Sequence, residues 1–250
     1  MAEWARGVAG VAVLSCAALW GQSAANAKPV LVELFTSEGC SDCPPADRLL
    51  ELLDTKQPVA GVHAIVLSEH VTYWNHDGWT DPFSMDELTE RQKEYETRLG
   101  VPDSYTPQMV VDGAVQFVGS NGPALQSALE KAATKDALTI ENARWENGGA
   151  SFAVHGSAAG AHLVAVLAAD ATQSSVARGE NAGKTLHHVA VVRVMKDLGA
   201  NAGDGRALKL AGGSLDHKDE TSGRVRLVVF LVDHKTGHVV GVAEETLSRE

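Results

Sequence analysis

The pattern of apolar residues changes near residue 137, and this change limits the folds that the chain can adopt. Before it, apolar runs typical of strands alternate with charged, amphipathic runs typical of helices. The expected strands cover residues 30–35, 59–67, 108–112 and 114–118, and the expected helices cover residues 46–53, 84–99 and 122–133. The order strand, helix, strand, helix, strand, strand, helix predicts an α/β domain over residues 28–136.

Residues 137–250 predict an all-β domain. Their apolar runs are short, often alternate with polar residues, and are separated by Gly, Asn and Asp. Short strands with turn residues between them are typical of an antiparallel sandwich. We therefore expect an α/β domain followed by an all-β, sandwich-like domain, with a short connection near residues 135–137.

Residues 1–27 read as an export signal and not as part of either domain. Arg6 supplies a positive charge, residues 8–20 form an apolar stretch, and the motif ANA at residues 25–27 matches a cleavage site. An uncleaved anchor and a lipid attachment at Cys16 are the alternatives. A stretch of about 13 residues is short for a bilayer span, so we expect a periplasmic or secreted protein with no membrane span after cleavage.

Charge and glycine pattern exclude two classes of ligand. The full chain carries 21 Lys and Arg against 32 Asp and Glu, a net charge of −11. An acidic surface repels phosphate backbones, so nucleic acid is not expected as a partner. The sequence also lacks a Gly-rich nucleotide fingerprint, and we expect no organic cofactor.

Signal cleavage would leave two cysteines, Cys40 and Cys43, in an oxidising compartment. A disulfide between them closes a four-residue loop, which stabilises a fold by only about 2 kcal/mol. Structural zinc commonly needs four ligands, but two thiolates with a histidine such as His70, His76 or His63 can hold copper(I). The pair can therefore be a structural disulfide, part of a metal site or a redox couple.

The redox interpretation needs no third thiol. A thiolate at a helix N-terminus is stabilised by the partial positive charge there. Cys40 comes first in the turn, so we expect it to be the exposed nucleophile, and Cys43 would resolve the mixed disulfide. Asp42 and Glu38 place negative charge beside the pair, which raises a thiol pKa and predicts a weakly oxidising couple.

The first half resembles a thioredoxin fold, with a CxxC pair at the first strand-to-helix turn. The resemblance implies a cis bond at Thr106-Pro107, with Pro107 shaping a peptide-binding edge beside the cysteines. It also implies that Glu33 is a buried strand acid that takes a proton from Cys43; a solvent-facing Glu33 is the alternative.

Four separated segments carry a longer resemblance. They are VELFTSEGCSDCPPAD, LSEHVTYWNHDGWTDPF, YTPQMVVDG and RGENAGKTLHHVAVVR. Together they resemble a family of secreted bacterial proteins of unassigned function that couples a thioredoxin-like half to a β-rich half. The resemblance implies that the charged residues of the last segment matter at the contact between the halves.

Residues 68–83 form an aromatic loop in a chain that is 5% aromatic. Trp74, Trp79 and His70 are candidate substrate-binding residues there, together with Thr106 beside the proline. Alternatively, the rings form a small core that joins the two halves. His187 and His188 are adjacent on a predicted strand, so their side chains point to opposite faces and do not suggest a metal site.

These observations predict an exported thiol–disulfide oxidoreductase that exchanges disulfides with protein or small-thiol clients and is recharged by a redox partner. The alternative is a binding module or copper(I) carrier with little turnover. The direction of exchange and the client stay open.

Overall fold

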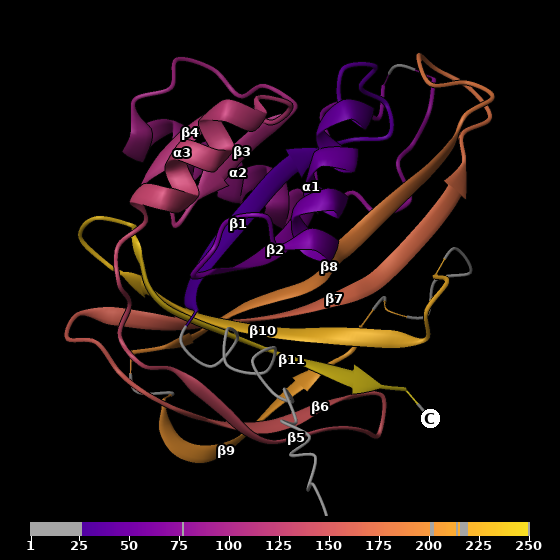
Figure 1. The fold of residues 1–250 in the computed structure, drawn as a ribbon. Helices are drawn as coiled ribbons and strands as arrows, with labels where there is room; N and C mark the ends of the chain where they lie inside the picture. The colour runs from indigo at the N-terminus through magenta and orange to yellow at the C-terminus, as the bar shows by residue number, and fades with distance from the viewer. Residues whose placement is uncertain (1–26, 77, 201–202, 214, 216–219, 250) are drawn as a thin grey trace, which may run out of the picture.

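The computed structural model describes residues 27–76, 78–200, 203–213, 215 and 220–249 (Figure 1). The expected export signal lies outside these residues apart from its last position, and so does Cys16. Within the described part of the chain, no helix is long and apolar enough to cross a bilayer.

The first half has the element order that the sequence predicts. Its elements are β1 (Lys28–Thr36), α1 (Pro44–Lys56), β2 (Val62–His70), α2 (Asp86–Leu99), β3 (Gln108–Val111), β4 (Val115–Val118) and α3 (Gly122–Lys131). Asp112 and Gly113 join β3 to β4 with φ angles of 53° and 63°, as a tight hairpin turn requires. Helix α2 ends at Gly100, in the left-handed conformation that glycine adopts easily.

The second half consists of strands. These are β5 (Thr139–Glu146), β6 (Gly149–His155), β7 (Ala161–Ser175), β8 (Thr185–Gly199), β9 (Asp204–Ala211), β10 (Arg224–Asp233) and β11 (Val239–Ser248). Strands β5, β6 and β9 form a three-stranded sheet. The other four join the strands of the first half in an eight-stranded sheet of order β11-β10-β7-β8-β2-β1-β3-β4.

The predicted fold class, an α/β thioredoxin-like domain followed by an all-β sandwich, is therefore wrong. One mixed sheet runs through both halves, and strands make up 47% of the described residues against 17% for helices. The reason is that β7 and β8 are each 15 residues long and reach beyond their own half (Figure 1). Strand β8 then pairs in parallel with β2, through Ser68 and Val191. The boundary near residue 136 stays a prediction.

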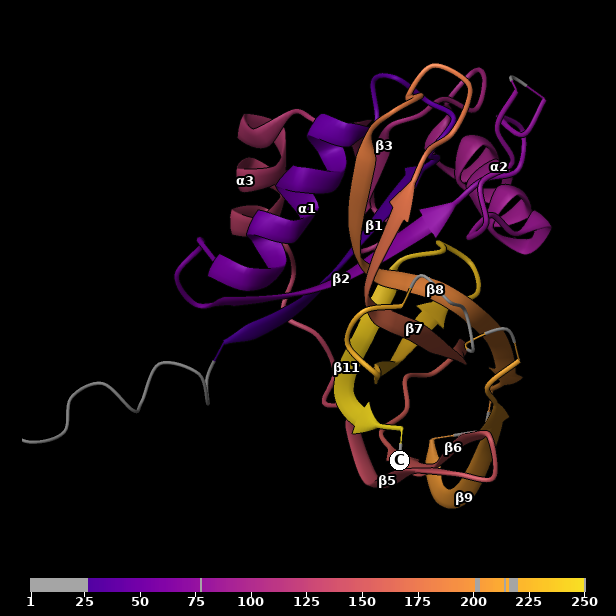
Figure 2. The same ribbon diagram turned by 90° about the vertical axis from the view of Figure 1, so that its right-hand side faces the viewer.

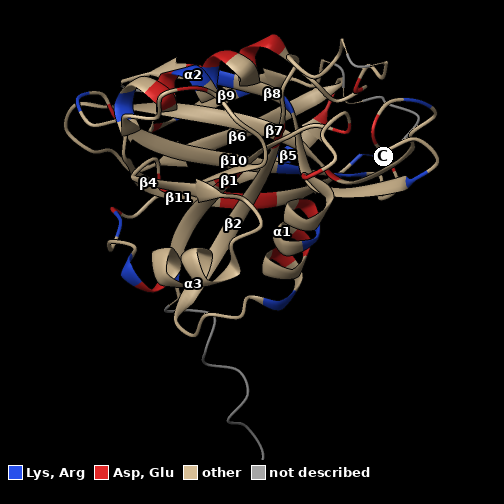
Figure 3. Ribbon diagram, turned by 90° about the horizontal axis from the view of Figure 1, so that it is seen from above, with Lys and Arg blue, Asp and Glu red and all other residues tan. Residues whose placement is uncertain are grey.

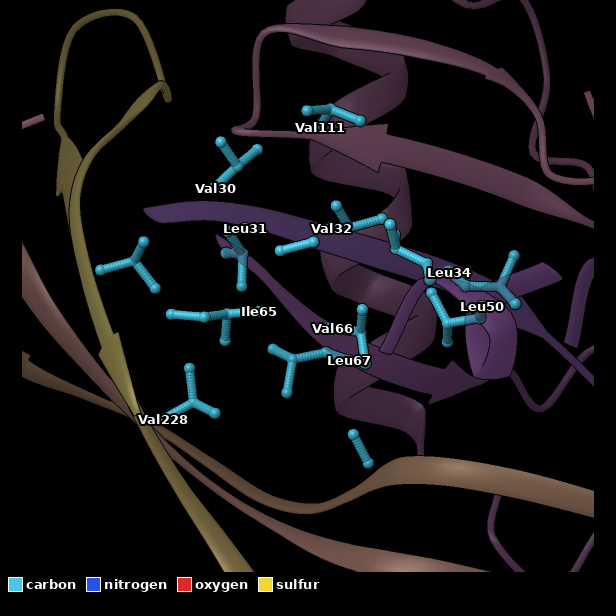
Figure 4. Close-up of a cluster of buried hydrophobic side chains, with 14 of the residues drawn as sticks. Val30, Leu31, Val32, Leu34, Leu50, Ile65, Val66, Leu67, Val111 and Val228 are labelled. Atoms are coloured by element: carbon cyan, nitrogen blue, oxygen red, sulfur yellow. The ribbon is translucent and has the colours of Figure 1, made fainter. Parts of the chain in front are cut away.

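The halves also share a hydrophobic core. Leu31, Ile65 and Leu67 of the first half belong to the same buried cluster as Val228 of β10 (Figure 4). A second cluster lies between the large sheet and the three-stranded sheet, and includes Phe152.

The three helices cover the first half of the sheet on both faces. Helices α1 and α3 lie on one face and α2 lies on the other (Figure 2). Helix α2 carries acidic and basic residues side by side, whereas the strands are mostly uncharged (Figure 3). The turn between β1 and α1, which contains the two cysteines, lies at the carboxyl end of β1.

Candidate functional site

Cys40 and Cys43 form a disulfide in the turn between β1 and α1, with their Cα atoms 5.5 Å apart. Hydrogen bonds from Cys40 N to Ser37 O (3.1 Å) and from Cys43 N to Cys40 O (3.3 Å) shape this turn. Helix α1 begins at Pro44, where the missing N–H has no intrahelical partner to lose. Cys43 therefore lies at the N-terminus of the helix, as the redox interpretation expects.

The side chains of the disulfide are covered. Cys40 is 1% exposed and Cys43 is 0% exposed, although Ser41 and Asp42 between them are exposed. This burial differs from the exposed Cys40 that the sequence predicts. In this structure, an attacking thiol would need part of the cover to move.

One part of the cover is the β7–β8 loop, residues 176–184. Asn181 is fully buried, and its Nδ2 donates to the carbonyl oxygens of Glu38 and Cys40, both at 2.8 Å. Ser41 N donates to the carboxylate of Glu180 at 3.1 Å, and the hydrogen bonds from Ser41 lower the pKa of Glu180. The loop is thus attached to the cysteine turn by polar contacts, near the top of Figure 2.

The aromatic loop forms another part of the cover. Trp79 Nε1 donates to Glu38 at 2.8 Å, and Trp74 Nε1 donates to Thr106 Oγ1 at 2.7 Å. A Cβ added to Gly39 would lie 3.0 Å from Trp74 Cβ, so the turn and the loop are in close contact.

The rings also pack into two hydrophobic clusters. Trp74 packs against a small cluster that contains Phe35 and Tyr95, and Phe83 belongs to the core of the second half. These contacts support the interpretation of the loop as a joining core. Substrate binding by Trp74 and Trp79 stays a prediction.

Thr106 and Pro107 lie beside the start of α1, and the bond between them is cis. Pro107 and Ala46 of α1 both lie within 3.1 Å of the position that a Cβ on Gly119 would occupy. The structure therefore brings together the cysteine turn, Trp74, Thr106 and Pro107. A cavity of 660 Å³ between α3, β4 and β11 is lined by neither cysteine.

Glu33 is buried, but it does not lie with the cysteines. Side chains alternate along a strand, so Glu33 is on the opposite face of β1 from Thr36, which donates to Asp47 of α1 at 2.9 Å. Glu33 instead binds Arg91 at 2.5 Å and accepts from Tyr95 at 2.6 Å. This placement argues against proton transfer from Cys43 to Glu33.

A buried polar network that sequence reasoning missed lies next to the disulfide. His188 of β8 lies between two carboxylates, with its Nε2 3.4 Å from Glu38 and its Nδ1 3.8 Å from Asp47. Burial lowers the pKa of His188, but the two carboxylates outweigh it and raise the pKa to about 10. The sequence predicted that His187 and His188 point to opposite faces of a strand, but no local signal indicated which of them is buried or which carboxylates it meets.

His70 belongs to the same buried region. Its Nδ1 lies 2.7 Å from Asp81, and its ring centre lies 4.6 Å from that of His188. His63, by contrast, pairs with Glu244 of β11. Among the residues that the structure describes, no group of three His, Cys, Asp or Glu side chains is arranged to hold a metal ion.

Comparison with known proteins gives a family and two similar folds. The model of a family described as "Protein of unknown function (DUF1223)" matches residues 31–232. A structural-genomics crystal structure of a protein from Agrobacterium tumefaciens is 24% identical, with a TM-score of 0.67, and the match covers 90% of this chain and 96% of that one. HBP35 of Porphyromonas gingivalis is 14% identical, with a TM-score of 0.58, and the match covers 88% and 76%. Comparison with curated proteins finds no match.

Proposed function

We propose that this protein, which belongs to the DUF1223 family of proteins of unknown function, exchanges disulfides with thiol partners through Cys40 and Cys43. The disulfide spans four residues and therefore contributes little as a brace. Its place at the start of α1 favours a thiolate there. Both features suit a bond that is made and broken.

The observation that carries the proposal is the polar attachment of the β7–β8 loop to the turn that holds the disulfide. Asn181 contributes two hydrogen bonds to the cysteine turn and Glu180 one. Each of the two bonds from the buried Asn181 is worth about 0.5–1.5 kcal/mol net, so their release costs roughly 1–3 kcal/mol. A population of about 1–15% would then have this part of the cover released, since each 1.4 kcal/mol is about tenfold.

The exchange itself follows ordinary thiol chemistry. A thiolate of the partner attacks Cys40 Sγ, a new disulfide forms to the partner, and the bond to Cys43 breaks with its electron pair on Cys43 Sγ. A second thiolate of the partner then attacks the partner sulfur of the mixed bond, so that a disulfide forms in the partner and the electron pair leaves with Cys40 Sγ. In the reverse direction, Cys40 attacks a partner disulfide, and Cys43 then attacks Cys40 Sγ, restores the Cys40–Cys43 bond and releases the partner as a thiolate. Net oxidation or reduction of a client requires a second thiol or disulfide partner, and we expect both partners in the periplasm or outside the cell.

Trapping with glutathione tests the proposal. The oxidised protein is incubated with reduced glutathione under native conditions, and free thiols are then alkylated and counted by mass spectrometry. We expect reduction without unfolding. We also expect Cys43→Ala, treated with oxidised glutathione, to retain a mixed disulfide at Cys40, and Cys40→Ala to retain less at Cys43. A folded protein whose disulfide resists excess thiol, and a Cys43→Ala variant without adduct, would refute exchange.

A second function, a binding module with a permanent disulfide, is favoured by the burial of both sulfurs. It predicts that the bond stays oxidised in the glutathione experiment. Copper(I) carriage is a separate alternative, because it requires the two cysteines in reduced form. It predicts that the reduced protein retains copper(I) against a competing chelator in a thiol-dependent way, with negligible exchange. Thiol exchange without copper retention would exclude the carrier.

A further inference from the structure

His188 lies where it can affect both cysteines. It contacts Glu38, two residues before Cys40, and Asp47, one helical turn after Cys43. Asp47 lies in the first turn of α1, and its N–H donates to the carbonyl oxygen of Cys43 at 3.1 Å. The His188 side chain therefore bridges the two ends of the disulfide turn.

More negative than positive groups surround His188. Its ring packs edge-on against His70, which is hydrogen-bonded to Asp81 at 2.7 Å. The centre of the His188 ring also lies 6.0 Å from that of Phe83. The guanidinium of Arg193 lies over the Phe83 ring. The charged and titratable groups in this region are Glu38 before α1, Asp47 on α1, His70 on β2, Asp81 in the aromatic loop and Arg193 on β8.

We propose that His188 is a positioning residue for exchange at Cys40–Cys43, whose positive charge offsets Glu38 and Asp47 so that Cys43 can leave as a thiolate. This inference rests on the proposed function. Without the imidazolium, the two buried carboxylates at the ends of the disulfide turn would lose their positive partner, and negative charge nearby disfavours a thiolate. With it, the partial positive charge at the N-terminus of α1 can act on Cys43.

The raised pKa of His188 supports this role, because the ring stays protonated at neutral pH. In the exchange step, the bond between Cys40 and Cys43 breaks and its electron pair moves to Cys43 Sγ. No proton has to move for the thiolate to be stabilised, since the charge of His188 acts through space.

The test measures the acidity of Cys43 directly. In a background in which Cys16 and Cys40 are Ala, the ultraviolet absorbance of the thiolate is titrated against pH, so that it reports Cys43 alone. We expect His188→Gln to raise the thiol pKa by about one unit, which lowers the thiolate fraction about tenfold at neutral pH. His187→Gln changes the adjacent, exposed histidine and should leave the titration unchanged.

A carboxylate variant makes the test independent of folding damage. Glu38→Gln removes a negative charge and should lower the thiol pKa, the opposite direction from His188→Gln. Asp47→Asn is the second variant if Glu38→Gln does not fold. Shifts in the same direction, or no shift in either variant, would overturn the inference. The titration uses no exchange partner, so the expected shifts together with an inert disulfide would refute the proposed function, whereas an active disulfide without the shifts would refute the role of His188 alone.

Discussion

At the scale of single residues, Glu38 has no exposed surface but is surrounded by partners. Its N–H donates to Asp81 at 2.8 Å, and its carboxylate contacts Trp79, Ser174 and His188. A buried carboxylate is costly unless it is paired and hydrogen-bonded, and loss of one partner leaves the charge uncompensated. Substitution of one residue in this polar network is therefore expected to affect its neighbours more than substitution of an apolar core residue would.

The pH dependence of stability should reveal the charge on His188. The folded pKa is raised to about 10 from 6.5, so the stabilisation is complete below about pH 6.5 and is lost as the pH rises to about 10. We expect the free energy of unfolding in urea to fall with a slope of up to about 1.4 kcal/mol per pH unit in this window. His188→Gln should remove this slope, and a slope that persists in the variant would contradict the assignment.

The close approach at Gly39 gives a second prediction. A Cβ there would lie 3.0 Å from Trp74 Cβ and 3.2 Å from Trp74 O. Because backbone cannot move aside easily, we expect Gly39→Ala to destabilise the protein by about 1–3 kcal/mol, measured by thermal unfolding. Gly122→Ala is the matched control, since nothing lies within 4 Å of a Cβ at that position. Equal effects of the two variants would show that the contact with Trp74 is not limiting.

The sequence could point to some candidate site residues but not to others. Cys40 and Cys43 came from a local motif and Pro107 from a resemblance, and both can be recognised without knowledge of the fold; their roles stay predictions. Glu33 was assigned a role from its place on a strand, but the face it lies on depends on where Arg91 of α2 packs. This packing depends on how the helices lie against the sheet, and the local sequence around Glu33 does not determine it.

At the scale of elements, the β7–β8 loop connects the second half to the cysteine turn. It is closed at its base by hydrogen bonds between Val176 and Lys184 and between Gly183 and Val176. Lys184 also donates to the Asn181 side chain at 2.9 Å, which orients the amide toward the turn. The loop therefore has a defined shape of its own, and its attachment to the turn is a separate set of contacts.

Asn181→Ala should loosen this attachment. The variant removes both hydrogen bonds to the turn, each worth about 0.5–1.5 kcal/mol. It also removes the bond from the Lys184 side chain but keeps the backbone hydrogen bonds at the base of the loop. We expect the disulfide to be reduced by dithiothreitol about 5- to 100-fold faster than in the unmodified protein. Arg178→Ala, an exposed change in the same loop, is the control. Unchanged reduction in Asn181→Ala would show that the loop does not limit access.

At the scale of the whole molecule, the pairing of β2 with β8 makes one sheet of two halves that differ in sequence pattern. Helix and strand positions were predictable because periodicity is local. The pairing of β2 with β8 was not predictable, because it joins Ser68 to Val191 across more than a hundred residues. The apolar sequence of a buried strand also does not show which other strand it pairs with. The bidentate pair of Arg226 with Asp54 crosses the same junction at 2.6 and 2.7 Å.

The shared core predicts that the two halves unfold together. Val228 of β10 is fully buried in the cluster that holds Leu31 and Ile65 of the first half. Val228→Ala should therefore lower the stability of both halves, by about 2 kcal/mol for a buried truncation. Urea unfolding is followed by fluorescence of single-tryptophan variants that keep Trp74 or Trp145, one probe for each half. We expect coincident transitions that shift equally, because loss of the common core removes packing from both sides. Two separate transitions, with only the Trp145 probe shifted, would mean that each half is stable without the other.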